Sequence, residues 1–130
     1  MKKPLPPRPA KDFTVCSIAW DLDIVHRHTR AGFEHVPDSL VYHRFFQFLD
    51  FIQQHGFTVR TVVASLAEVT PATTLRNSDL SDEGFRFIQY AEPRWCRRLH
   101  KDTGPDREWA FLERWLQRFR KLPATSTRTA

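Results

Sequence analysis

Residues 37–56 read PDSLVYHRFFQFLDFIQQHG, and this stretch decides the fold. Pro37 and Asp38 supply a helix start, and Gly56 stands where the residue after a last helical turn adopts a positive φ. Between them apolar side chains recur at the spacing of one helical face. That face carries Val41, Phe45, Phe48, Leu49 and Ile52, and Phe46 and Phe51 widen it. So much aromatic surface requires burial from more than one side, so we expect this helix at the centre of the core.

Two further helices are predicted downstream. Ser81 is placed to cap a helix that continues towards Lys101, with Pro93 inside it, where the helix must kink or restart. Asp106 begins another helix that runs to about Leu122. Both stretches carry an apolar seam at helical spacing, which indicates that each packs one face against the rest of the domain.

Two shorter segments show β-type patterns. Apolar and polar side chains alternate within residues 13–25, and residues 57–64 are rich in β-branched side chains. We read both as strands, although Ile18, Leu22 and Val25 also fit one helical face and Thr58 could instead cap a helical turn. Residues 71–79 are read as a loop. The prediction is a compact, mainly α single domain of three or more helices with room for a short β element. The alternative is an α+β fold in which 13–25 and 57–64 pair.

The two ends of the chain differ from its middle. Residues 1–12 hold four prolines and are expected to form a disordered basic tail, and residues 123–130 contain nothing to bury. The globular domain is therefore predicted at residues 13–122. Within the first tail, PPRPAK at residues 6–11 matches a PxxPx+ pattern accepted by SH3-type grooves, although a solvated basic tail explains it better.

Composition excludes several classes of protein. A chain of 130 residues suits one domain, and four glycines leave no room for a Gly-rich phosphate loop. No apolar run approaches the roughly 18 residues of a membrane span. Prolines stand where a secretory signal would carry its apolar stretch, so we expect a cytoplasmic protein with no membrane partner.

Charge is distributed unevenly along the chain. The formal net charge of +5 divides into +3 for residues 1–12, −4 for 13–93 and +6 for 94–130. The last segment holds ten Lys and Arg against four Asp and Glu. The modest total therefore hides a basic C-terminal end, which is an argument about partners and not about fold.

Helical spacing places many of these cations on common faces. If the last two helices form a hairpin, their two basic stripes merge into one positive surface. The predicted partner-binding residues are Arg94, Arg97, Arg98 and Lys101 in the first stripe and Arg107, Arg114, Arg118 and Lys121 in the second. Arg and Trp together are also common at the hot spots of protein interfaces.

We therefore expect a non-enzymatic binding or regulatory protein whose Trp- and Arg-rich C-terminal helices engage an acidic protein partner. Nucleic acid is the alternative partner, because a basic surface also attracts phosphates. The chain has no RNP1, zinc-finger or bZIP pattern to favour it. No cofactor is expected, and the pattern leaves the oligomeric state open, a homodimer included.

A metal- or thiol-dependent enzyme is the second alternative. Its metal ligands would be His26, His28, Glu34 and His35. Arg27 and Arg30 lie among them and oppose a divalent cation, so a polar loop explains them better. Cys96 and His100 are four residues apart, and the surrounding arginines would favour a thiolate. Cys16 follows the apolar alternation of its segment and is read as core, so no metal or catalytic residue is assigned.

Overall fold

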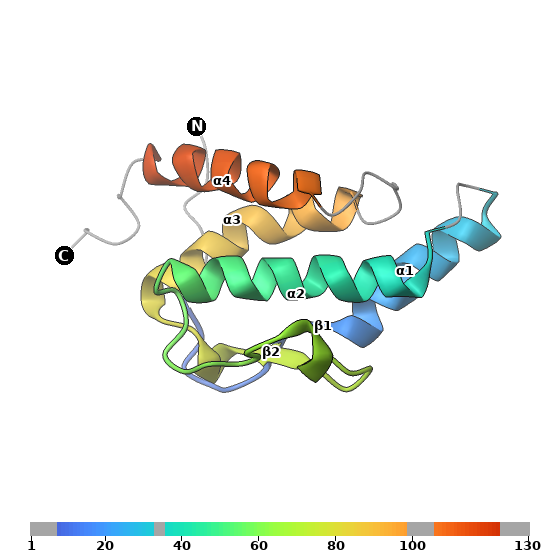
Figure 1. Cartoon of the computed structure of the whole chain (residues 1–130). Helices are drawn as coiled ribbons and strands as arrows, with labels where there is room; N and C mark the ends of the chain where they lie inside the picture. Colours follow the sequence, from blue (N-terminus) through green and yellow to red (C-terminus); the bar gives the residue numbers. More distant parts are fainter. Residues whose placement is uncertain (1–7, 33–35, 99–105, 123–130) are drawn as a thin grey trace.

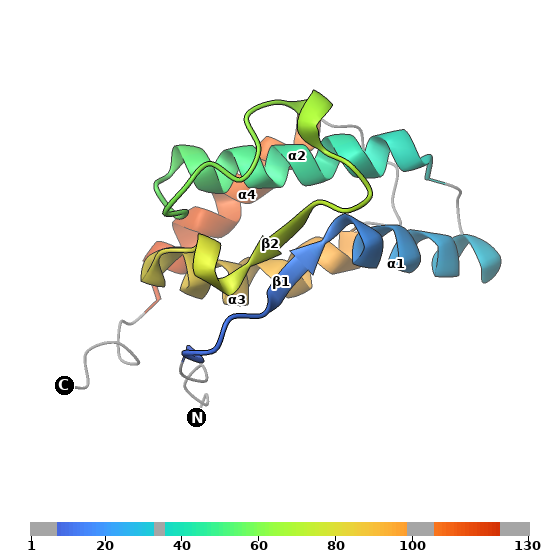
Figure 2. The same ribbon diagram turned by 90° about the horizontal axis from the view of Figure 1, so that it is seen from below.

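The computed structural model describes residues 8–32, 36–98 and 106–122 (Figure 1). The elements in chain order are β1 (Thr14–Ser17), α1 (Ile18–Arg30), α2 (Asp38–Gln54), η1 (Leu66–Glu68), β2 (Thr74–Arg76), η2 (Asn77–Asp79), α3 (Asp82–Arg98) and α4 (Asp106–Arg120). Here η marks a single turn of 3-10 helix. In the described ranges β1 and β2 form one antiparallel two-stranded sheet, seen side by side in Figure 2. The prediction of a mainly α fold with a short β element is confirmed.

Helix α2 lies at the centre of the core, as the aromatic stretch predicts. Seven of its side chains are buried. The ring of Phe48 lies 4.8 Å from that of Trp95 on α3, and the ring of Phe51 lies 5.0 Å from that of Trp109 on α4. The sheet covers another side of α2 (Figure 1). Gly56 ends the helix with φ 73°, which confirms the C-terminal signal.

The strand predicted for residues 13–25 is wrong beyond its first part. Only Thr14–Ser17 is a strand, and α1 follows immediately. The cause is a cap, because the hydroxyl oxygen of Ser17 accepts the N–H of Trp20 at 3.1 Å and starts the helix. The buried residues of α1 are Ile18, Asp21 and Val25, which is a helical spacing. Trp20, on the apolar side of the presumed strand, is instead 50% exposed.

The strand predicted for residues 57–64 is also wrong. Thr58 forms one isolated bridge to Leu80, and the following residues are irregular. The Gln53 side chain takes the place of a partner strand: its oxygen accepts the N–H groups of Val62 and Val63, and its nitrogen donates to the Val63 carbonyl. The strand that pairs with β1 is β2, inside the segment predicted as a loop.

The last two helices form as the sequence predicts. The Ser81 hydroxyl accepts the N–H of Gly84 at 3.0 Å and caps α3. α3 then continues through Pro93 to Arg98 without stopping there. α4 packs on both α2 and α3, and its Phe119 ring lies 5.6 Å from Phe87. None of the helices in the described ranges is both long and apolar enough to cross a membrane.

The predicted domain boundaries stay predictions. Residues 1–7 and 123–130, which make up the greater part of the two predicted tails, lie outside the described residues. Residues 8–12 of the N-terminal tail are described, and they contact η2 and the start of α3. We call residues 8–12 the N-terminal arm.

Candidate functional site

The second basic stripe lies on the outer side of α4. The buried residues of this helix are Leu112, Trp115 and Leu116. Arg114, Arg118 and Lys121 follow one another at intervals of four and three residues, and all three are exposed. Because this spacing keeps side chains on one helical face, the three cations share a face that points away from the core. Arg107 belongs to the same helix, but its side chain is outside the described part of the structure.

The first stripe is divided between solvent and the junction with α4. Arg97 is exposed. The guanidinium carbon of Arg94 lies 3.8 Å from the ring centroid of Tyr90, and its Nη1 donates to the Tyr90 carbonyl at 2.6 Å. The Tyr90 ring lies 6.1 Å from Phe119 of α4, so Arg94 sits where the two helices meet. The side chain of Arg98, and Lys101, lie outside the described residues.

Several arginines elsewhere in the chain are balanced by a carboxylate, whereas the exposed cations of the two stripes are not, within the described part of the structure. Four such arginine–carboxylate pairs are Arg8–Asp82, Arg27–Asp23, Arg60–Asp79 and Arg76–Asp12, with nitrogen–oxygen distances of 2.6, 3.0, 2.5 and 3.0 Å. Within the ranges that the structure describes, Arg97, Arg114, Arg118 and Lys121 form no ion pair. Their charge therefore faces solvent without a carboxylate beside it.

The tryptophans of the C-terminal helices belong to the core rather than to a binding surface. Trp95 and Trp115 are 3% and 6% exposed, and Trp109 packs edge-on against Phe51. The exposed tryptophan is Trp20, on α1. Reading residues 18–30 as a helix would have shown this, because a helical wheel places Trp20 opposite Ile18 and Val25.

The histidines do not assemble as the strand interpretation required. α1 is a helix, so His26 and His28, two residues apart, do not share a face. His26 Nε2 lies 2.8 Å from Asp38 Oδ1, and His28 Nδ1 lies 2.8 Å from the Ile24 carbonyl oxygen. Glu34 and His35 fall outside the described residues. In the part that is described, no group of three or more potential metal ligands occurs.

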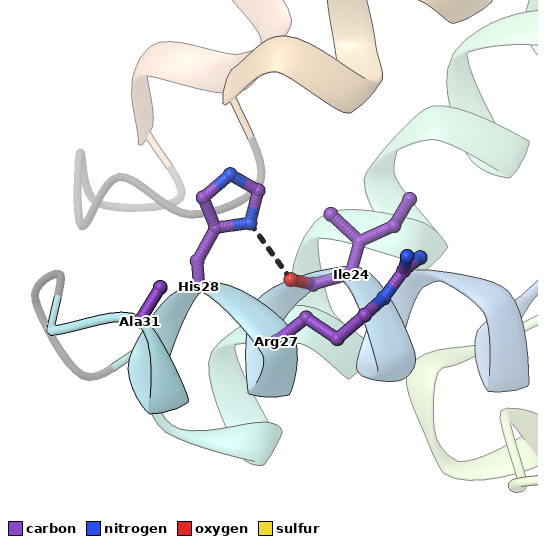
Figure 3. Close-up of a pocket in the computed structure, with 4 residues that line it drawn as sticks. All are labelled: Ile24, Arg27, His28 and Ala31. Atoms are coloured by element: carbon purple, nitrogen blue, oxygen red, sulfur yellow. Dashed lines mark hydrogen bonds between the residues drawn. The ribbon is translucent and has the colours of Figure 1, made fainter.

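A shallow pocket of about 330 Å³ lies beside the last two turns of α1 (Figure 3). Its described lining consists of Ile24, Arg27, His28 and Ala31. The two polar side chains are engaged within their own helix, His28 with the Ile24 carbonyl and Arg27 with Asp23. Ligand pockets need convergent polar groups that are available to orient a ligand, so this hollow is a weak candidate.

A buried carboxylate that was not predicted from the sequence lies between α1 and α3. Asp21 is 3% exposed, and Trp95 Nε1 donates to its Oδ2 at 3.3 Å. Burial, followed by repulsion from the Glu92 carboxylate, raises the pKa of Asp21 to about 7 against the opposing effects of Trp95 and Arg44. The spacing of Asp21 from Ile18 and Val25 on a helical face was the signal that could have revealed it.

Cys96 lies beside this carboxylate and does not form the predicted thiolate. Its Sγ donates to Glu92 Oε2 at 3.3 Å. Burial and the negative charge of Glu92 raise the pKa of the Cys96 thiol, so the thiolate hypothesis based on the neighbouring arginines is wrong. His100 is not among the described residues. Cys16 is buried as predicted, burial raises its pKa well above the usual value, and both cysteines are free thiols.

Cys96 should therefore be a slow nucleophile. At about pH 8 we expect iodoacetamide to alkylate it at least about tenfold more slowly than it alkylates glutathione, because little thiolate is present. Glu92→Gln should raise the rate by removing the adjacent negative charge. Mass spectrometry of peptides containing Cys96 measures both rates, with Cys16 as an internal control that reacts only after unfolding. A Cys96 rate equal to that of glutathione would contradict this assignment.

Comparisons of the chain with protein-family models, with curated proteins and with solved structures found no match.

Proposed function

We propose that this protein is a non-enzymatic binding protein that engages an acidic protein partner through the exposed cations of α3 and α4. The observation that carries the proposal is the row of exposed cations on one face of α4, which lack ion-pair partners in the described part of the structure. Arg8, Arg27, Arg60 and Arg76 each pair with a carboxylate of the same chain. The outward cations of α4 have no such partner among the described residues.

The spacing of these cations suits a partner with regularly placed carboxylates. Arg114, Arg118 and Lys121 project from successive turns of one rigid helix, which is packed against α2 and α3. A helix rises about 5.4 Å per turn, so the three positive charges form a short linear array. Such an array recognises an acidic peptide with little loss of conformational freedom, and it speeds association through long-range attraction.

The placement of the aromatic side chains favours protein over single-stranded nucleic acid. Proteins that bind single strands combine basic grooves with exposed aromatic rings on which the bases stack. Trp95 and Trp115 are buried, and Trp109 packs against Phe51. Duplex DNA, which is bound through its phosphates, is the alternative that the experiment must separate.

Reversing charge on α4 should strongly weaken binding to an acidic probe. We expect the double variant Arg114→Glu/Arg118→Glu to bind labelled poly-L-glutamate at least about tenfold more weakly than the wild type, because two attractions become repulsions. Fluorescence anisotropy measures the dissociation constants. The matched control is Lys11→Glu/Arg30→Glu, which changes net charge equally at two exposed positions away from α4.

The outcomes separate the proposal from its competitors. Loss of poly-L-glutamate binding in the α4 variant, with the control within about twofold of wild type, supports the proposed surface. Equal loss in both variants shows that net charge alone drives association, and it overturns the proposal. A third outcome is that the protein binds a duplex of about 20 base pairs tightly, with strong salt dependence, and does not bind poly-L-glutamate. This result identifies nucleic acid, and not an acidic protein, as the partner.

A further inference from the structure

The Arg8 side chain is held by four hydrogen bonds to η2 and the start of α3. Its Nε donates to Asn77 Oδ1 at 2.9 Å and its Nη1 donates to Asp82 Oδ1 at 2.6 Å. Its Nη2 donates twice, to the carbonyl oxygens of Asn77 at 2.6 Å and Leu80 at 2.8 Å. The guanidinium also lies 5.3 Å from the ring centroid of Phe85. Four of the five N–H groups of a guanidinium are thus satisfied around one aromatic face.

This set of acceptors is specific for a guanidinium group. The four contacts reach all three nitrogen atoms of the guanidinium, which the single nitrogen of a lysine ammonium cannot reproduce. We call the acceptors and the ring, from Asn77, Leu80, Asp82 and Phe85, the arginine cradle. The cradle joins η2 to the first turn of α3.

The cradle is held in place by contacts that do not involve Arg8. The N–H of Leu80 donates to the Asn77 carbonyl, and the N–H of Ser81 donates to the Phe57 carbonyl. The Asp79 carboxylate accepts the N–H of Arg76 at 2.8 Å, which fixes the start of η2. Removing the Arg8 side chain therefore leaves the two carbonyl acceptors in place. The arm holds the Asn77 side chain through the Pro9 and Lys11 carbonyls, and the Asp82 side chain is 93% exposed.

The N-terminal arm, in contrast, depends on polar contacts for its position. Residues 9–12 are all exposed, so they contribute no side chain to the core. Asn77 Nδ2 donates to the carbonyls of Pro9 and Lys11, and Asp12 accepts from Ser78. Arg8 itself stays 24% exposed. A pocket of about 360 Å³ lies between arm and η2, so a small ligand can reach the cradle from solvent.

We propose that the arginine cradle is a binding site for an arginine side chain, and that the chain's own Arg8 occupies it as an exchangeable internal ligand. The proposal is independent of the basic surface on α4. The proline on each side of Arg8 favours an extended backbone, which presents the side chain outward. The ligand class that the cradle accepts is accordingly an arginine in an extended, proline-flanked peptide. Binding of such a peptide displaces Arg8.

Chemical rescue tests whether the cradle binds a guanidinium from solution. Arg8→Ala in the full chain should lower Tm by about 5 °C, because charged hydrogen bonds are lost. Ethylguanidinium at about 20 mM should then recover about half of that loss by binding the folded state. Ethylammonium at the same concentration should recover none, and the wild type should respond to neither compound. Arg97→Ala, an exposed arginine on α3, is the matched control that should show neither the loss nor the rescue.

Each result decides the proposal. Rescue of Arg8→Ala by ethylguanidinium alone supports a guanidinium site. A decrease in Tm without rescue shows that Arg8 is a structural anchor only. An unchanged Tm shows that the cradle does not hold Arg8. Either result overturns the proposal. If Arg8→Ala fails to fold, Arg8→Lys is used in its place. This variant retains a positive charge near Asp82 but lacks the planar guanidinium group. The proposal then requires that the Tm of Arg8→Lys be lower than that of the wild type and that ethylguanidinium, but not ethylammonium, raise it. An equal Tm, or no increase with ethylguanidinium, overturns the proposal.

Discussion

Replacing Asp21 by Asn should stabilise the protein by about 4 kcal/mol at pH 8 and by only about 1 kcal/mol at about pH 4.5. The cause is the burial of the Asp21 carboxyl group between α1 and α3, which, with the Glu92 charge, raises its pKa from 3.8 to about 7. Asn keeps an oxygen that accepts the Trp95 N–H, and it carries no charge to bury.

The direction of the pH dependence follows from proton binding in the two states. Between about pH 4 and pH 7 the unfolded chain has released the Asp21 proton while the folded protein retains it, so stability falls as pH rises. The contribution of Asp21 is complete below the unfolded pKa and is lost by the time pH passes the folded value of about 7. Asp21→Asn removes this dependence.

The neighbours of Asp21 modify the size of the effect and not its sign. Glu92 repels the carboxylate, whereas Arg44 of α2 and the Trp95 hydrogen bond favour it. The Glu92 repulsion exceeds the Arg44 attraction, and burial exceeds both. Cys96 and Cys16 also interact with the Asp21 and Glu92 carboxylates. Both thiols have raised pKa values and stay neutral across this pH range.

Urea unfolding at a series of pH values measures the prediction. The free energy of unfolding of the wild type should fall from about pH 4.5 to pH 8, and the difference from Asp21→Asn should grow over the same interval. Asp23→Asn is the control, since Asp23 lies on the same helix but is exposed and paired with Arg27. A difference between wild type and Asp21→Asn that does not vary with pH would show that Asp21 is ionised throughout.

Helix prediction succeeded where burial and local signals agree. Residues 37–56 combine an apolar face with a start at Pro37 and an end at Gly56, and α2 has those limits within one or two residues. Residues 13–25 carry conflicting signals, because a strand-like alternation also contains three residues at helical spacing. The Ser17 hydroxyl decides between them by capping α1, and a single hydroxyl is a small signal in a linear sequence.

The candidate sites were predictable to different degrees. The outward cations of α4 follow from helical periodicity alone, and their exposure agrees with it. The arginine cradle could not be predicted, since Arg8 reaches acceptors about seventy residues away and two of them are backbone carbonyls. Carbonyl positions depend on the path of the chain at η2 and carry no residue-type signal. The same holds for Gln53, whose amide replaces a strand partner for residues 62–63.

A second large effect is expected at Gly84, where Ala should destabilise the fold by about 2–3 kcal/mol despite its higher helix propensity. Gly84 lies in the first turn of α3 and is buried. A methyl group there would overlap the carbonyl oxygen of Phe57 and lie 2.8 Å from its carbonyl carbon and Cβ. In an exposed helix the same substitution would stabilise the protein by up to about 1 kcal/mol. The sign of the change in the free energy of unfolding therefore shows whether Gly84 is packed against Phe57.

The Phe57 carbonyl cannot move aside cheaply. It accepts the N–H of Ser81 at 2.9 Å and the Ser81 hydroxyl at 3.2 Å, which tie it to the start of α3. The Phe57 side chain is fully buried, with its ring 5.2 Å from that of Phe87. Relief of the overlap therefore requires α3 to shift away from its cap or Phe57 to leave the core. Either movement loses contacts that stabilise the junction.

Urea unfolding of Gly84→Ala should show a lower midpoint at an unchanged slope, because the fold is weakened without a change in the surface exposed on unfolding. Gly56→Ala is the matched control: its φ of 73° costs a side chain about 1 kcal/mol, but no atom lies within 4 Å of the added methyl group. Gly84→Ala should therefore be the more destabilising substitution, although Gly84 lies within a helix and Gly56 does not. The reverse order, or a gain in stability at Gly84, would mean that α3 does not begin in contact with the Phe57 carbonyl. The Ser81 cap and the arginine cradle would then lose the fixed chain path on which both depend.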